Sequence, residues 1–196
     1  MQSSLYVALS AQVATQKRLE TIANNLANST TAGFRAAETK FEAMLGDEST
    51  ENVHCSSSGD TYITREAGAL TKTDNPLDVA VQGDAWFAVQ TPAGTVYTRD
   101  GRMQMTPQGE LQSLLGYPIL DVGGAPVQVD PDGGTLRIAQ DGMITQNNRQ
   151  LGAIGLFTID PKATLERYDN SGVIPDTPAT PALDFSRVGV VQGFVE

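Results

Sequence analysis

The most reactive side chains of the chain belong to His54 and Cys55, which are adjacent and are each the only residue of their type. A nucleophilic cysteine needs a histidine base at hydrogen-bond distance and a third group that orients the base, and neighbouring residues rarely achieve that geometry. A metal site needs three or four ligands at defined spacing. Both residues lie in a polar run over 46–59 that offers no such set. We therefore expect neither catalysis nor metal binding from them.

Two other patterns have the residue types of a binding site but not its spacing. Asp130 and Asp132 suggest a calcium loop, yet the positions that require Gly and Glu are Thr135 and Asp141. The glycine pairs at 123–124 and 133–134 lack the Lys-Ser/Thr of a phosphate loop. Nothing singles out a catalytic pair among the 23 acidic residues. The sequence predicts no enzyme, no catalytic or metal residue, no cofactor and no small-molecule substrate.

Composition limits the partners. The chain has 196 residues, of which 40% are hydrophobic and 18% charged, enough for a buried core in one or two domains. Its net charge is −10 and it has no basic run, which argues against nucleic-acid binding. The start does not resemble a cleaved secretory signal, and no stretch approaches the ~20 apolar residues of a membrane span.

The element that needs an explanation is a predicted helix over residues 1–28. Its apolar stripe consists of Leu5, Ala8, Leu9, Leu19, Ile22, Ala23 and Leu26. The seven-residue spacing of this stripe is typical of a helix that packs against another helix. The alternative is a helix lying on the sheet of the same chain, which the seven-residue period and the long polar run at 46–59 disfavour.

The helix is expected to end in an asparagine-rich stretch. Asn24, Asn25 and Asn28 compete for backbone hydrogen bonds, and Gly33, followed by Phe34, is expected to supply the left-handed position that stops the helix. We interpret the amides as bridges between packed helices.

The remainder predicts a mainly β fold. A weaker helix is expected over 36–45 and a mobile loop over 46–59. Short strands separated by Asp-Gly and Gly-Gly turns then predict antiparallel β structure over 61–160, because the connections are too short for parallel crossovers. The Pro-rich segment 161–181 is expected to be an extended return, and 188–191 a last strand.

The run from Trp86 to Val89 is apolar on both faces and is expected to be a central strand. Trp86, Phe87, Tyr97 and Tyr117 fall at strand positions and are expected to belong to the core.

The predicted domains follow from these elements. They are a terminal helix and turn that mediate assembly (1–35), a connecting segment (36–75), an antiparallel β-domain (76–186) and a return strand (187–196).

Four stretches, in order and spacing, resemble the bacterial flagellar rod and hook proteins. They are residues 23–35, 75–87, 97–103 followed by 109–111 and 116–120, and 190–196. The last contains the C-terminal motif Gln192, Gly193, Phe194 and Glu196. The opening residues 5–10 are most similar to proximal-rod members, with distal-rod paralogues as the close alternative.

The resemblance implies a structural subunit of the flagellar basal body, needed for motility. It implies export by the flagellar type III apparatus without a cleaved signal, and assembly with rod subunits into a helical tube in the periplasm. In this family the C-terminal motif leads into a long helix that forms a coiled coil with the first; here the sequence stops at Glu196. The alternative from another class is a periplasmic enzyme or a peptidoglycan-binding β-domain.

Overall fold

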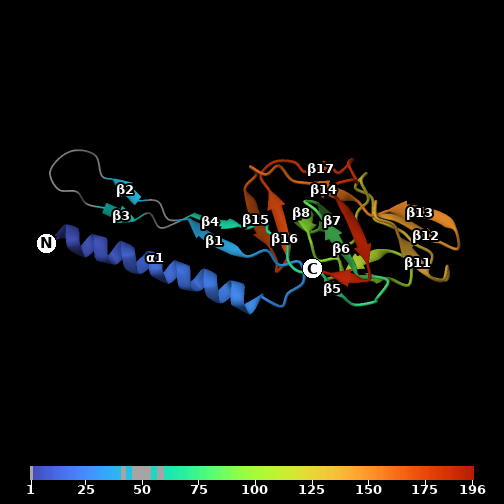
Figure 1. Cartoon of the computed structure of the whole chain (residues 1–196), viewed down its shortest axis with the longest axis horizontal. Coiled ribbons are helices and arrows are strands. Elements are labelled where there is room, and N and C mark those ends of the chain that lie inside the picture. The colour runs from blue at the N-terminus through green and yellow to red at the C-terminus, as the bar shows by residue number, and fades with distance from the viewer. Residues whose placement is uncertain (1, 41–42, 46–53, 57–59) are drawn as a thin grey trace. The chain divides into compact units, whose positions relative to one another are not determined.

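The computed structural model describes residues 2–40, 43–45, 54–56 and 60–196, and the side chains of residues 8–40 and 60–196 (Figure 1). The chain divides into two units, each described here by itself. The first contains Met1–Thr30 and Arg35–Arg65, and the second contains Thr31–Phe34 and Glu66–Glu196.

The first unit begins with helix α1 (Gln2–Ala27), which confirms the helix predicted over 1–28. The absence of Gly and Pro leaves the backbone ladder uninterrupted over these residues. The helix ends where polar side chains donate hydrogen bonds to its last backbone carbonyls. The Asn28 amide donates to the Asn24 carbonyl at 3.0 Å, and the Ser29 hydroxyl donates to the Leu26 carbonyl at 2.9 Å.

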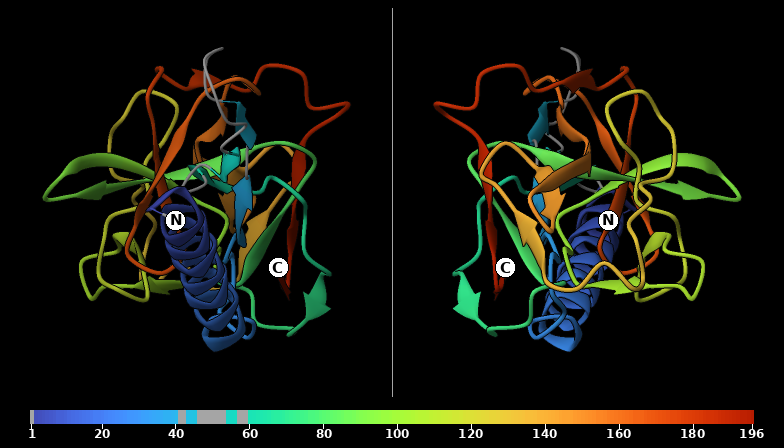
Figure 2. Two further views of the ribbon diagram at one scale, coloured as in Figure 1. Left: turned by 90° about the vertical axis from the view of Figure 1, so that its left-hand side faces the viewer. Right: turned by 90° about the vertical axis from the view of Figure 1, so that its right-hand side faces the viewer.

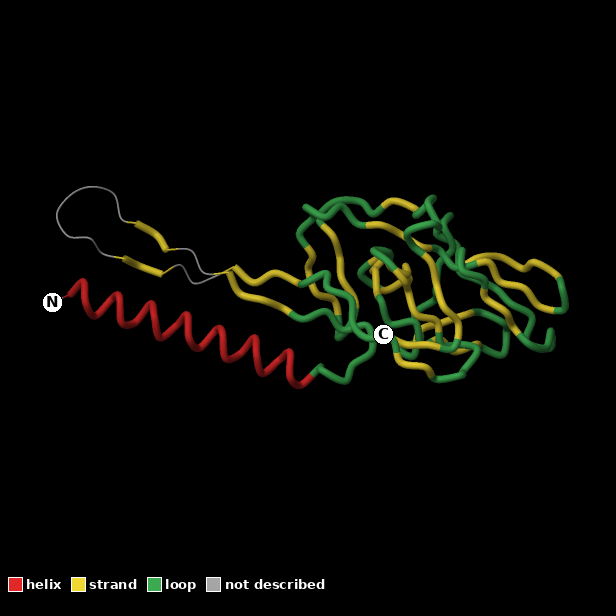
Figure 3. The backbone as a smooth tube through the Cα atoms, in the orientation of Figure 1, coloured by secondary structure: helices red, strands yellow, loops and turns green. Residues whose placement is uncertain are grey.

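A two-stranded ribbon follows the helix in the same unit (Figure 3). Strand β1 (Ala37–Lys40) pairs with β4 (Asp60–Ile63), and β2 (Ala43–Leu45) pairs with β3 (His54–Ser56), both antiparallel. The helix predicted over 36–45 is therefore wrong. Three apolar residues on one helical face were a weak signal, and pairing with the distant segment 54–63 overrides local propensity.

The mobile loop predicted over 46–59 lies mostly outside the described residues, which omit 46–53 and 57–59. His54 and Cys55 belong to β3.

The second unit is built on a sheet that has six strands in the described part of the chain, in the order β15–β16–β8–β7–β14–β17 (Figure 1). These are β15 (Leu165–Tyr168), β16 (Gly172–Pro175), β8 (Gly94–Thr98), β7 (Trp86–Thr91), β14 (Leu156–Thr158) and β17 (Thr180–Pro181). Smaller sheets pair β18 (Gly189–Gln192) with β6 (Val79–Gln82), β19 (Phe194–Val195) with β5 (Thr71–Lys72), and β10 (Leu111–Ser113) with β9 (Met103–Met105), and a further sheet has the order β11 (Leu136–Ile138), β12 (Met143–Gln146) and β13 (Arg149–Ala153).

Each pairing among the described strands is antiparallel, as the short connections predicted. Strand β7 is central, as its apolar residues on both faces indicated. Trp86, Phe87 and Ala88 are all buried within it.

The core of the second unit collects the inward-facing residues of these sheets. Figure 2 shows the ribbon that carries these strands in two further views. Its largest fully buried side chains include Trp86, Phe87, Leu111, Ile119 and Ile144. Tyr97 and Tyr117 are partly buried; the ring of Tyr97 meets that of Phe157 edge-on, with centroids 5.6 Å apart. These aromatic residues fill the β unit, as expected from their strand positions.

The extended return predicted over 161–181 is wrong over residues 165–175, where β15 and β16 form a hairpin. The turn between them uses a positive φ of 49° at Asp169, a residue type that tolerates this conformation without glycine. The hairpin also gains a neighbour, since Val173 pairs with Tyr97 of β8. Proline marks the end of β16 at Pro175 and lies in β17 at the sheet edge.

No helix among the described residues combines the length and the apolar character needed to cross a membrane.

Candidate assembly surface

The two faces of α1 differ in an unexpected way. The partly covered residues recur at helical spacing and are small or polar: Ser10, Ala14, Lys17, Thr21, Asn25 and Asn28. The predicted apolar stripe lies on the opposite side of the helix and is exposed, with Leu9 53%, Leu19 61%, Ile22 51% and Leu26 72% accessible. Ala8 and Ala23 are also exposed, and the side chain of Leu5 lies outside the described residues.

Within the first unit, the helix packs through its polar face and leaves its apolar face uncovered. Val13, which the heptad pattern missed, is also exposed at 48% and follows Leu9 by one helical turn. The four-residue spacing from Leu9 is the feature of the sequence that could have identified Val13.

Asn25 ties the helix to strand β1. Its side-chain amide donates to the Ala37 carbonyl at 2.8 Å and its side-chain oxygen accepts from the Ala37 amide at 2.9 Å. The side chain thus acts as a strand partner for Ala37, which requires a donor and an acceptor on one group. A second contact joins the hydroxyls of Thr21 and Thr39 at 3.2 Å. The asparagine amide therefore bridges helix and strand, rather than two helices as we interpreted it from sequence.

We expect Asn25→Asp to loosen this attachment. The carboxylate keeps the acceptor but faces the Ala37 carbonyl without a donor, so local opening at Ala37 becomes easier by about 1–3 kcal/mol. Hydrogen exchange at the Ala37 amide measures the change. Asn24→Asp is the matched control, because Asn24 uses its side-chain oxygen only as an acceptor for Asn28, at 2.9 Å. Equal exchange at Ala37 in the two variants would contradict the role of Asn25.

Gly33 has the positive φ that the sequence predicted, 69°, but it does not end the helix, which stops six residues earlier at Ala27. Its conformation serves a close approach instead. A Cβ atom on Gly33 would lie 2.2 Å from the backbone nitrogen of Asp100. The Gly33 amide donates to the Glu196 carbonyl at 2.9 Å.

Phe34, beside Gly33, lies under a cation. The Arg167 guanidinium carbon is 4.4 Å from the centre of the Phe34 ring, a cation–π distance. Burial lowers the pKa of Arg167.

The C-terminal motif is held by hydrogen bonds throughout. The Gln192 side chain donates to the carbonyls of Pro76 at 2.8 Å and Leu136 at 2.9 Å, and accepts from the Ile138 amide at 3.2 Å. Gly193, with a φ of 80°, donates its amide to the Asp78 carbonyl at 2.7 Å. Phe194 pairs with Lys72 of β5.

Glu196 occupies a buried site. Its carboxylate accepts from Arg99 Nε at 2.7 Å and from the Gly68 amide at 2.6 Å. Glu196 and Gly33 are thus brought together although they stand far apart in sequence. Arg99, which completes this group, was not identified as a site residue from sequence, since nothing in the residues around it marks a buried arginine.

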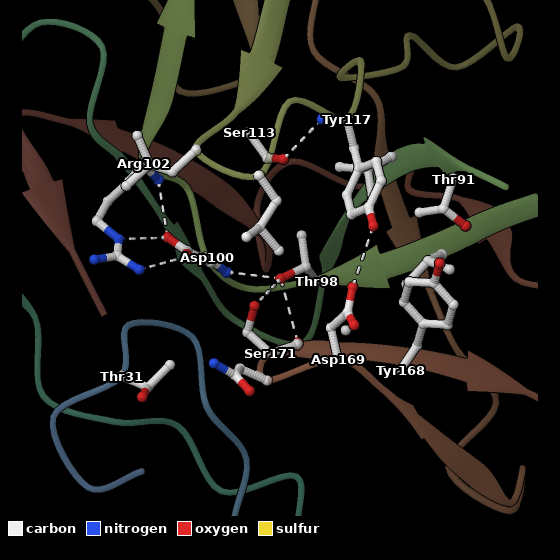
Figure 4. A pocket seen from close by; sticks show the side chains of 16 residues that line it. Thr31, Thr91, Thr98, Asp100, Arg102, Ser113, Tyr117, Tyr168, Asp169 and Ser171 are labelled. Carbon is white, nitrogen blue, oxygen red and sulfur yellow. Dashed lines mark hydrogen bonds and ion pairs between the residues drawn. The ribbon is translucent and has the colours of Figure 1, made fainter. Parts of the chain in front are cut away.

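A pocket of the second unit is lined by residues that include Asp100, Arg102 and Tyr117 (Figure 4). Its polar groups bind one another: Arg102 pairs with Asp100 at 2.7 Å, and Tyr117 donates to Asp169 at 3.4 Å. Hydrogen bonding with Tyr168, then burial and the nearby charge of Asp169, raise the pKa of Tyr117 above its usual value. The lining residues include no histidine or cysteine that could act as base or nucleophile.

Metal chemistry has no support from the described residues either, because no three His, Cys, Asp or Glu side chains among them gather closely enough to hold an ion. The exposed apolar side of α1 indicates binding through a surface.

Comparison with known proteins agrees with this interpretation. Residues 5–35 match the family described as "Flagella basal body rod protein", and residues 80–146 match "Flagellar hook protein FlgE/F/G D1 domain". These matches cover most of α1 and the centre of the β unit.

Individual relatives match over longer stretches. The chain is 53% identical over 196 residues to the flagellar basal-body rod protein FlgF of Mesorhizobium japonicum, covering 100% of this chain and 81% of that protein. It is 47% identical over the same lengths to FlgF of Rhizobium meliloti. It is 29% identical over 183 residues to the rod protein FlgG of Bacillus subtilis, covering 82% of this chain and 69% of that protein.

The relatives are structural proteins of the rod, so the alternative of a periplasmic enzyme or peptidoglycan-binding domain is not favoured. The exposed stripe, the matched terminal segment and the identity to FlgF proteins over the whole of this chain agree. The chain belongs to the FlgF group of flagellar basal-body rod proteins.

Proposed function

We propose that this rod subunit occupies the proximal rod, where its α1 stripe packs against terminal helices of neighbouring subunits. The family supports assembly with other rod and hook subunits in the basal body. The proximal position is supported by identity to FlgF proteins at 53% and 47%, against 29% for the FlgG protein compared.

The observation that carries this proposal is the exposure of the apolar side of α1 while its polar side is covered. Burying a Leu or Ile side chain stabilises a contact by about 1.5–3 kcal/mol, so Leu9, Leu19, Ile22 and Leu26 together provide a strong driving force for helix packing. A seven-residue period favours a coiled-coil layer. Contacts that do not close on themselves generate a helical tube, which is the geometry of a rod.

The remaining steps are proposals from the resemblance. The chain is exported by the flagellar type III apparatus without a cleaved signal, and it assembles in the periplasm. The residues of the apolar stripe of α1 are proposed as the assembly site. The helix-exit residues Asn24, Asn25, Asn28, Gly33 and Phe34 and the motif Gln192 to Glu196 are proposed to belong to the same site. No nucleic acid, cofactor or small-molecule substrate takes part in this function.

The test is to find the subunit in the organelle. A tagged chain is expressed in a motile bacterium whose own copy is deleted, and basal bodies are isolated and imaged with an antibody against the tag. We expect label on the proximal rod and restored swimming. Label on the distal rod would overturn the proximal assignment, and absence of label from basal bodies that otherwise assemble would overturn the rod function.

A further inference from the structure

The second unit contains a buried ion pair between Arg99 and Glu196. Arg99 Nε lies 2.7 Å from the Glu196 carboxylate, and the two side chains are 3% and 2% exposed. Arg99 also donates to the carbonyls of Gly83 and Ala85, both at 2.7 Å, and of Val81 at 3.1 Å. Its guanidinium is therefore fixed by β6 and the turn after it, in one orientation.

Glu196 binds two other segments of the chain beside this fixed arginine. Its second carboxylate oxygen accepts from the Gly68 amide at 2.6 Å, and its backbone carbonyl accepts from the Gly33 amide at 2.9 Å. A side chain on Gly68 would approach the Glu196 side chain to 3.3 Å. The segments at 33, 68 and 196 thus converge on Arg99, although each is distant from the others in sequence.

Gly33 closes the group from the other side. It lies so near the backbone of Arg99 and Asp100 that a Cβ atom would be 2.6 Å from the Arg99 carbonyl carbon. Residues 31–34 are therefore seated on the residue that holds Glu196. We call the set Gly33, Gly68, Arg99 and Glu196 the junction.

From this geometry we infer that Arg99 and Glu196 are positioning residues for rod assembly. Their ion pair holds the polypeptide at residue 196 beside the polypeptide at residue 33, through which the chain of the assembly helix joins the β unit. The inference rests on the proposed rod function. In this inference, the ion pair sets the separation and the relative direction of the segments at residues 33 and 196. Regular packing of helices in a rod depends on that separation and direction.

The buried ion pair is better suited to positioning than to stability. Taking two charges out of water offsets most of their mutual attraction, so such pairs contribute little net stability compared with apolar residues. What they provide is direction, because a planar guanidinium and a carboxylate bind at defined angles. An apolar contact at this place would tolerate sliding of residue 196 past residue 33.

The test uses the full-length protein with Glu196→Gln, which keeps the shape of the side chain and removes its charge. We expect hydrogen exchange at the Gly33 and Gly68 amides to rise about tenfold, because a charge-assisted bond is lost at the junction. Exchange at Leu111 and Ile119, whose amides bind Val127 and Leu111 inside the unit, should stay at the wild-type rate. The amount of subunit in isolated basal bodies should fall by about tenfold or more.

The control separates positioning from stability. Ile144 is fully buried in β12 and outside the junction, and Ile144→Val or Ile144→Ala is chosen to match the melting temperature of Glu196→Gln. The control should enter basal bodies as the wild type does. Equal loss in both variants, or normal incorporation of Glu196→Gln, would overturn the inference. Absence of the wild-type chain from basal bodies would instead overturn the rod function, while exchange at Gly33 and Gly68 would still decide whether the pair holds the junction.

Discussion

Leu26→Asp is expected to remove the subunit from the rod while leaving the β unit folded. Leu26 is 72% exposed, so a carboxylate there stays hydrated in the free subunit and changes the free energy of unfolding by about 0.5 kcal/mol or less. When another helix packs on the stripe, the same carboxylate is desolvated without a partner, which costs several kcal/mol. We expect the subunit content of isolated basal bodies to fall about 100-fold, the equivalent of ~2.7 kcal/mol.

Neighbouring residues of α1 supply the matched control. Leu19→Asp should act as Leu26→Asp does, because Leu19 belongs to the same stripe. Arg18→Asp introduces the same carboxylate one residue away but off the stripe, at an exposed position, and should leave incorporation near the wild-type amount. Circular dichroism should show unchanged β structure in all three. Loss of the β signal in the leucine variants, or equal incorporation of all three, would contradict the division between an assembly helix and a separately folded β unit.

Gly33→Val is expected to have the second large effect, by displacing residues 31–34 from the β unit. Two costs combine at this position. A residue with a Cβ atom pays about 1–2 kcal/mol to adopt the left-handed conformation, and a β-branched residue pays more. The Cβ atom would also lie 2.2 Å from the Asp100 nitrogen, so the backbone itself must move. We expect the hydrogen bond from residue 33 to the Glu196 carbonyl to break and swimming to be lost.

Gly124→Val measures the conformational cost alone. Gly124 has a φ of 81°, and a Cβ atom built on it meets no atom within 4 Å. Comparing the melting temperatures of the two variants therefore isolates the contribution of the collision at Gly33. The Gly33 variant should be the less stable of the two, and only it should lose motility. A similar change in both would show that residues 31–34 can move aside at no cost.

Several features were predictable because they depend on neighbours in sequence. The heptad spacing of Leu5, Leu19 and Leu26 predicted the helix and its apolar face. Alternating polarity and Asp-Gly or Gly-Gly turns predicted antiparallel strands, since short connections allow nothing else. The run from Trp86 to Val89, apolar on both faces, predicted a central strand.

Two of the errors have the same physical cause, a partner distant in sequence, and the third has a local cause in a turn. The segment at 36–45 became β1 and β2 because residues 54–63 pair with it. Asn25 bonds to Ala37 instead of a second helix, since the strand edge offers an amide and a carbonyl at the spacing of one side-chain amide. The hairpin of β15 and β16 was missed because Asp169 adopts a positive φ without a glycine to signal it.

The sequence by itself determined which residues are apolar, where turns occur and to which family the chain belongs, because those properties reside in residue types and their local spacing. Only the tertiary structure decided that the polar face of α1 is covered while its leucines are exposed. It also decided that Gly33 and Glu196 meet at Arg99. These are contacts between segments separated by tens of residues. Their energies depend on burial and on hydrogen-bond geometry, neither of which exists until the chain has folded.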